Sequence, residues 1–158
     1  MDGDPDLGGY LRSTYSRLVS RMVTVEKPIV VALHGPVDGA GVAIALACDL
    51  RIAAENAKFS VAFIKIALMP DAGVSFLLPR IVGLGRAMGL SMLGDAVEVG
   101  ETLRIGLVNK VVPAERRSNL PLPVPKSILV RPTSRRSPRR VADTSIIETV
   151  AVSLRAFL

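Results

Sequence analysis

The sequence has 158 residues, of which 49% are hydrophobic, 22% charged and 4% aromatic, with one Cys, one His and no Trp. This is the length of one globular domain; one Cys excludes a disulfide framework within it, and one Cys with one His cannot supply the ligands of a structural zinc site. The net charge is +6, but eight basic and no acidic residues lie between 116 and 142, so the other residues are slightly acidic in total.

The spacing of hydrophobic residues, together with the glycines and prolines that interrupt it, predicts alternating helices and strands. Apolar residues recur every three or four positions over 11–25, which is typical of an amphipathic helix. Further helices are expected at 42–47, 74–82, 86–93 and 101–105. Buried strands are expected at 29–33, 50–54, 58–61 and 107–112. Strands that alternate with helices predict an α/β layer architecture.

The sequence divides into three regions. We expect an N-terminal segment with the amphipathic helix at 1–26, a core at 27–115 and a basic tail at 116–158. The tail has prolines among its arginines and no sustained helical period, which predicts irregular chain, although 144–158 is compatible with a short amphipathic helix. The abrupt change of composition near 116 suggests the hypothesis that the tail is a degenerate end or a shifted reading frame.

Membrane and nucleic-acid partners are not expected. No apolar run approaches the roughly 20 residues that span a bilayer, and residues 1–6 are acidic where a signal peptide is basic. The basic tail lacks interleaved aromatic residues and any nucleic-acid recognition motif. These features indicate a cytoplasmic protein.

A set of motifs from Lys27 to Pro113 carries a family resemblance. The pieces KPIVVALHGPVDGAG, ALACDLRIAAENAKFS, LMPDAG, LLPRIVG and GLVNKVVP occur in order over about 87 residues. They closely resemble the crotonase (enoyl-CoA hydratase/isomerase) superfamily. The stretch 62–73 looks most like the branch that isomerises ring-epoxide and unsaturated acyl-CoAs in phenylacetate degradation.

The resemblance implies a partial crotonase-type (ClpP/crotonase-like) spiral of ββα turns, because the family's earlier turns would precede residue 1. It further implies a role in fatty acid or lipid metabolism and an acyl-CoA substrate. No metal and no cofactor are expected other than the coenzyme A of that substrate. A homo-oligomer, trimeric or hexameric, is also implied.

The resemblance places an oxyanion hole at Gly39-Ala40-Gly41. Its backbone N–H donor falls at Ala40, where small residues let a thioester carbonyl approach a helix N-terminus. The family's second donor would lie on one of the missing earlier strands. Ala43 and Phe63 occupy the positions of the two glutamates that hydratases use, so hydration, which needs both an acid and a base, is the less favoured reaction.

Asp71 is the remaining carboxylate in this pattern and matches the proton-shuttling aspartate of isomerase-like members. One base suffices for isomerisation, because it can return the proton that it removes. Apolar residues nearby in the pattern, Phe63, Met69, Phe76 and Leu77, are expected to desolvate it. Alternatively, Asp71 is an N-cap of the following helix, as is common for Asp at such a boundary.

The remaining polar positions favour structural roles. Asp49 and Arg51 are expected to fix the neighbouring strand, His34 to be structural, and Cys48 to be a small buried hydrophobe. The function that these patterns favour is double-bond isomerisation of an acyl-CoA, with Asp71 and Ala40 catalytic. Residues expected to contact substrate are Gly39, Gly41, Ala43, Phe63 and Phe76. The alternative is a catalytically inactive truncated remnant or an interaction module, because uncovered apolar faces promote association.

Overall fold

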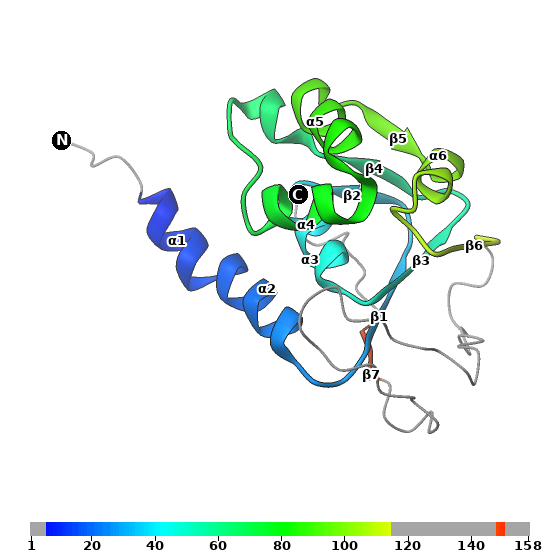
Figure 1. Cartoon of the computed structure of the whole chain (residues 1–158), viewed down its shortest axis with the longest axis horizontal. Coiled ribbons are helices and arrows are strands. Elements are labelled where there is room, and N and C mark those ends of the chain that lie inside the picture. Colours follow the sequence, from blue (N-terminus) through cyan, green and yellow to red (C-terminus); the bar gives the residue numbers. More distant parts are fainter. Residues whose placement is uncertain (1–5, 115–147, 151–158) are drawn as a thin grey trace.

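A computed structural model of the chain describes residues 6–114 and 148–150 (Figure 1). The helices are α1 (Leu7–Ser13), α2 (Tyr15–Thr24), α3 (Ala40–Ala47), α4 (Val74–Val82), α5 (Leu84–Leu93) and α6 (Val99–Arg104), with a 3-10 helix η1 (Ala62–Ile66). The strands are β1 (Ile29–Leu33), β2 (Pro36–Asp38), β3 (Leu50–Ala54), β4 (Lys58–Ser60), β5 (Ala96–Glu98), β6 (Lys110–Val112) and β7 (Glu148–Val150).

Two sheets organise the described residues. The larger has the order β6-β3-β1-β7 and all of its pairs are parallel. The smaller has the order β2-β4-β5, in which β2 pairs with β4 in parallel and β5 pairs with β4 antiparallel. Helices pack around both sheets (Figure 1), which confirms the α/β architecture expected from the sequence.

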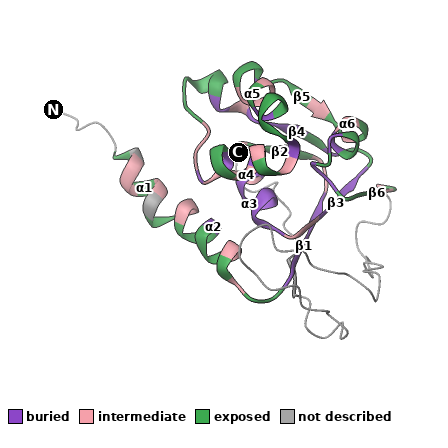
Figure 2. Ribbon diagram, in the orientation of Figure 1, coloured by how far each residue is buried: buried purple, intermediate pink, exposed green. Residues whose placement is uncertain are grey.

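The core lies where α3 meets the strands. All five residues of β1 are buried, and so are the six consecutive residues 42–47 of α3. A helix that is apolar on every side is stable only when it is enclosed on every side. Figure 2 accordingly shows β1 and α3 in the buried colour, whereas much of α5 is exposed.

The elements with the strongest local signal were predicted well. The expected bounds of β1, β3 and α4 agree with the structure. The helix expected over 11–25 is instead two helices that meet at Thr14, because the Ser13 and Thr14 hydroxyls donate to the Tyr10 carbonyl oxygen at 2.9 and 2.6 Å. Such side-chain bonds compete with the helical backbone ladder. The first helix starts at Leu7, where the Asp6 carboxylate accepts from the Gly9 N–H at 2.7 Å.

Of the helix expected over 144–158, the structure describes only Glu148–Val150, which forms β7 and not a helical turn. The other residues of the expected tail, like residues 1–5, lie outside the described part of the chain. The hypotheses on the origin and irregularity of the tail fall in that region.

Arg51 and Asp49 fix β3 to its surroundings, as expected. The Asp49 carboxylate accepts from the first backbone N–H of β1 at 2.8 Å. The buried Arg51 side chain donates from Nε to the Leu107 carbonyl at 2.6 Å and from Nη1 to the Cys48 carbonyl at 2.7 Å. The Arg51 N–H donates to Asn109 Oδ1 at 2.8 Å. One guanidinium thereby joins the end of α3 to the segment before β6.

Gly94, which ends α5, should not tolerate a side chain. Its φ is +66°, and an added Cβ would lie 2.7 Å from Ile64 Cγ2. We expect Gly94→Ala to lower the free energy of unfolding by about 1–3 kcal/mol. Gly85→Ala, in the same helix with open space at its Cβ, should be neutral or stabilising. Chemical denaturation of both variants checks this, and equal midpoints for the two would contradict it.

Candidate active site

The Gly39-Ala40-Gly41 turn connects β2 to α3. Gly39 has φ +50°, a conformation that favours glycine, and Ala40 is the first residue of α3. The first N–H groups of a helix have no acceptor within the helix, and no described residue accepts the Ala40 N–H. Nothing lies within 4 Å of the position that a Gly39 Cβ would occupy. Within the described part of the chain, the turn therefore has a backbone donor without an acceptor and open space at the Cα of the neighbouring Gly39.

Asp71 lies between η1 and α4, and its carboxylate is partly buried. Its Oδ1 is buried and has no hydrogen-bond partner among the described residues. Burial raises the pKa of Asp71 above its ordinary value of 3.8, and a hydrogen bond from its own backbone acts in the opposite direction. With one oxygen unpartnered among the described residues, the carboxylate can accept a proton from a ligand at Oδ1.

The structure does not form the N-cap that was the alternative for Asp71. The capping residue of α4 is Gly73, and α4 has no side-chain cap. It is the Asp71 carbonyl, not its carboxylate, that accepts from the Val74 N–H at 2.8 Å. The next two residues, Ala72 and Gly73, have φ of +45° and +89°. Positive φ in an alanine stores strain, which often occurs at functional sites.

Ala43 and Phe63, which stand where hydratases have their two glutamates, lie in the core. Ala43 is 0% exposed in α3, and Phe63 is 6% exposed in η1. Both belong to the main hydrophobic cluster. Neither position can therefore supply an acid or a base.

The apolar surroundings expected for Asp71 are only partly present. Met69 is 82% exposed and Phe76 is 54% exposed, so these two side chains do not enclose a carboxylate as expected. Phe76 instead packs under the Arg80 guanidinium, which lies 3.4 Å from the centroid of its ring. The expected contribution of Phe63 and Leu77 is compatible with their burial, since Phe63 is buried and Leu77 half-buried.

An electrostatic influence of Lys65 on Asp38, beside the turn, was not foreseen. Asp38 directly precedes Gly39, and burial raises the pKa of its carboxyl while the positive charge of Lys65 on η1 lowers it. The sequence alone gave no signal that relates Asp38 to Lys65. The two are 27 positions apart along the chain, so only the fold brings them together.

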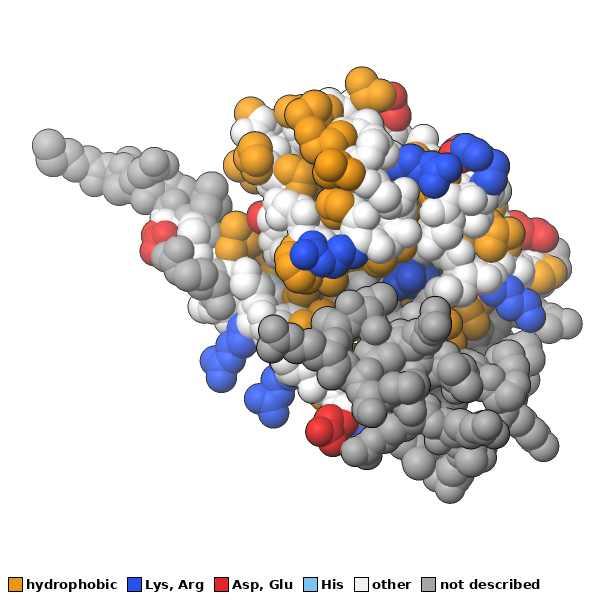
Figure 3. Space-filling model, in the orientation of Figure 1, with side chains coloured by type: hydrophobic (Ala, Val, Ile, Leu, Met, Phe, Trp, Pro, Cys, Tyr) orange, Lys and Arg blue, Asp and Glu red, His pale blue; other side chains and the backbone are white. Residues whose placement is uncertain are grey.

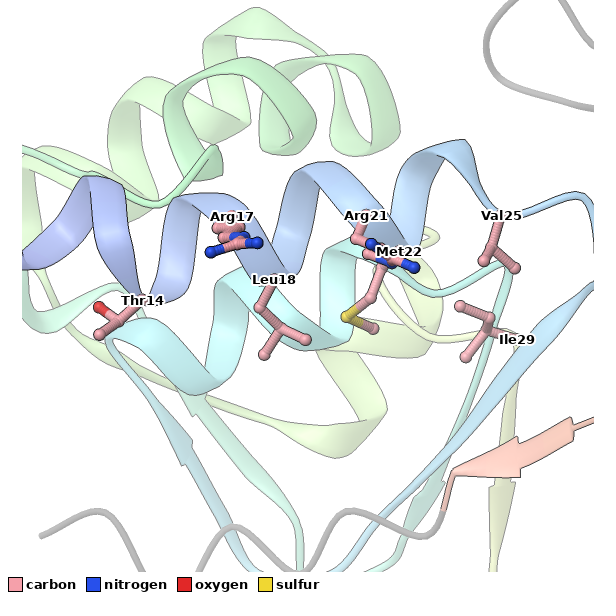
Figure 4. A pocket seen from close by; sticks show the side chains of 7 residues that line it. All are labelled: Thr14, Arg17, Leu18, Arg21, Met22, Val25 and Ile29. Atoms are coloured by element: carbon pink, nitrogen blue, oxygen red, sulfur yellow. The ribbon is translucent and has the colours of Figure 1, made fainter.

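One cavity among the described residues lies away from these positions. It is an open groove of about 340 Å³ along α2, shown in Figure 4. Its lining residues are Thr14, Arg17, Leu18, Arg21, Met22, Val25 and Ile29. None of the residues expected at the active site lines this groove.

In residues 6–114 and 148–150, no cluster of three or more His, Cys, Asp or Glu is placed to hold a metal ion. None of the described helices has the length and apolar character needed to cross a bilayer.

The profile of the enoyl-CoA hydratase/isomerase family matches residues 3–121. This chain belongs to the enoyl-CoA hydratase/isomerase family. The family resemblance read from the motifs is thereby confirmed.

Similar proteins within this family include both isomerases and hydratases. A 1,2-epoxyphenylacetyl-CoA isomerase of Escherichia coli K12 is 38% identical over 129 residues, which are 82% of this chain and 49% of that protein. A probable enoyl-CoA hydratase of Rhodobacter capsulatus is 42% identical over 103 residues, 65% of this chain and 40% of that protein. The chain therefore spans about half or less of the length of these relatives.

Solved structures of the family have the same fold over the matched part. An enoyl-CoA hydratase/isomerase from Cupriavidus metallidurans is 36% identical with a TM-score of 0.67, and the match covers 73% of this chain and 43% of that one. An enoyl-CoA hydratase from Mycobacterium avium subsp. paratuberculosis is 42% identical with a TM-score of 0.66, over 68% and 44% of the two chains. The described residues thus form part of a crotonase fold.

Proposed function

We propose that this protein moves a double bond within an acyl-CoA thioester, with Asp71 as the base and the Ala40 N–H as an oxyanion donor. With a 3-enoyl-CoA, the Asp71 carboxylate removes a proton from the α-carbon, which is also allylic. The electrons pass into a dienolate whose oxygen accepts the Ala40 N–H. Asp71 then returns the proton to C4, so that one C–H bond breaks, one forms, and the double bond moves to C2–C3.

The observation that carries the proposal is that Asp71 Oδ1 is buried and has no partner among the residues that the structure describes. A structural carboxylate is ordinarily hydrogen-bonded when it is buried, because an unpaired polar atom costs stability. Desolvation also brings the pKa of a carboxyl nearer to the range in which it exchanges protons efficiently. Asp71 combines both properties.

Isomerisation is favoured over hydration because only one carboxylate is present in the pattern. Addition of water requires one group to deprotonate the water and another to protonate the α-carbon. Ala43 and Phe63 provide neither, and both are buried in apolar surroundings. The proposal requires no cofactor other than the coenzyme A of the substrate.

A two-substrate assay tests the proposal. We expect the purified chain to convert a 3-enoyl-CoA to the conjugated 2-enoyl-CoA, followed by absorbance of the conjugated thioester, and to leave crotonyl-CoA unhydrated. Hydration of crotonyl-CoA without isomerisation would contradict the assignment, and so would an absence of turnover on both.

The rate of isomerisation should depend on pH through Asp71. The base must be ionised, and burial raises its pKa above 3.8, so activity should fall on acidification at a higher pH than it would for an exposed aspartate. The pH profile of kcat/KM measures this pKa in the free protein. An acid limb with its midpoint at or below 3.8 would contradict the desolvated state of the carboxylate.

One observation supports a second candidate function, an interaction module. Large apolar side chains are exposed along η1, the loop after it, α4 and α5, and Figure 3 shows hydrophobic side chains gathered where α5 lies in Figure 1. They include Ile64, Ile66, Met69, Phe76, Leu84, Met88, Met92 and Leu93. Contiguous apolar surface of this kind marks association sites. Concentration-dependent association together with silence in both enzyme assays would favour this candidate.

A further inference from the structure

Ser60 is the last residue of β4, and it is hydrogen-bonded both to the Gly39-Ala40 turn and to Gly94 at the end of α5. Its carbonyl oxygen accepts from the Gly39 N–H at 3.3 Å, and its hydroxyl donates to the Gly94 carbonyl oxygen at 3.1 Å. Ser60 is 6% exposed and is one of few polar residues that the described core buries. A buried hydroxyl in this place therefore ties the turn to the end of α5.

Gly94 is itself held in place by η1. The atoms nearest to an added Cβ would be Ile64 Cγ2 at 2.7 Å and Lys65 Cε at 3.5 Å, so these two side chains lie against the backbone of Gly94. Lys65 also acts electrostatically on Asp38, the residue before Gly39. Hydrogen bonds and packing thus connect the turn through Ser60 to Gly94, and Gly94 to η1.

We propose that Ser60 is a positioning residue that sets the direction of the Ala40 N–H. This inference rests on the proposed function in so far as that N–H serves as an oxyanion donor. Gly39 is the N-cap of α3, and its bond to Ser60 is the only backbone bond that its N–H forms with the described residues. Because this bond links the turn to the end of β4, the position of the Ser60 backbone influences the geometry of the turn.

The Ser60 hydroxyl holds that backbone through Gly94. The strand pairing of β4 with β2 at Asp38 and with β5 at Ala96 fixes its direction. The side-chain bond to Gly94, 34 residues away, adds a further restraint on the end of the strand beyond the register of these pairs. Removing the hydroxyl leaves the Gly94 carbonyl without its donor and frees the end of β4 to shift. A small shift of a donor is enough to lower a rate substantially.

Hydrogen exchange tests the inference without requiring turnover. In Ser60→Ala, amides of the segment 37–46 should exchange about tenfold faster than in the unaltered chain. Ser75→Ala, which removes an exposed hydroxyl on α4, is the matched control and should not change this segment. Ser60→Thr keeps a hydroxyl and should restore slow exchange. If Ser60→Ala does not fold, Ser60→Cys, with a weaker donor of similar size, replaces it.

Kinetics separate a positioning role from a merely structural one. On a 3-enoyl-CoA, Ser60→Ala should lower kcat about tenfold while KM changes less than about twofold, because donor direction matters most in the transition state. Unchanged exchange over 37–46 in Ser60→Ala overturns the inference, whatever its stability. If the unaltered chain has no turnover, the proposed function fails, while exchange that is faster over 37–46 and unchanged in the rest of the fold still supports the role of Ser60 in holding the turn.

Discussion

Replacing Asp71 with Asn should lower kcat for double-bond migration by about a thousandfold, within the range ascribed to a positioned general base. The amide of Asn has nearly the shape of the carboxylate but cannot accept the proton from the α-carbon. The Ala40 N–H and the surrounding backbone are unchanged, so binding of the thioester should be retained. Assays of turnover and titration calorimetry with the same 3-enoyl-CoA measure the two properties separately.

The stability of Asp71→Asn provides an independent check on the same side chain. Because burial raises its folded-state pKa, protonated Asp71 favours the fold at low pH, and this contribution is lost as the pH rises through the raised pKa. At neutral pH the ionised carboxylate therefore destabilises the fold, and Asn removes this destabilisation. The midpoint of unfolding at pH 7 should be equal to or higher than that of the unaltered chain.

The matched control is Asp95→Asn, which neutralises an exposed carboxylate in the loop after α5. It should leave kcat, KM and the unfolding midpoint close to their original values. Equal turnover of Asp71→Asn and the unaltered chain would remove Asp71 from the mechanism. A large loss of stability in Asp71→Asn would show that the carboxylate has a structural partner after all.

The parts of the fold that were predictable from the sequence are those that a local pattern determines. The run of β-branched residues in β1 is stable only as a buried strand. The helical spacing of apolar residues in α4 is stable only as a helix with one buried face. By contrast, β2 and β5 have three residues each, which is too short for an alternating hydrophobic pattern to be recognised in the sequence. They become strands because β4 lies between them and supplies their backbone partners.

The same division holds for the candidate site. Gly39, Ala40 and Asp71 were identified because they stand in short motifs, in which spacing along the chain carries the signal. Ser60 and Lys65 were not, because their relation to the turn is created by packing between distant segments. The exposure of Phe76 could not be foreseen either, since an apolar residue in a helix has the same pattern whether or not a neighbour covers it.

Replacing Arg51 with Ala should cause the largest loss of stability of any single change considered. Its guanidinium donates to the carbonyl oxygens of Cys48 and Leu107, two residues that are each 3% exposed. Without Arg51, both oxygens lose charged donors in a place that water reaches poorly. Each unsatisfied group costs about 1–3 kcal/mol, so we expect the free energy of unfolding to fall by about 3–5 kcal/mol.

Two further variants separate lost hydrogen bonds from lost packing. Arg51→Met keeps most of the aliphatic volume but has no donor, so it should lose less stability than Arg51→Ala and still fall well below the unaltered chain. Arg104→Ala, which removes an exposed guanidinium paired with Glu101, should change the midpoint little. Urea unfolding of the three variants measures these differences.

If Arg51→Met is as stable as the unaltered chain, the cost of burying the charged group offsets the stability gained from its hydrogen bonds, as in buried ion pairs that apolar residues replace without loss. Arg51 would then serve to align the end of α3 with the segment before β6 and would add nothing to the stability of the fold.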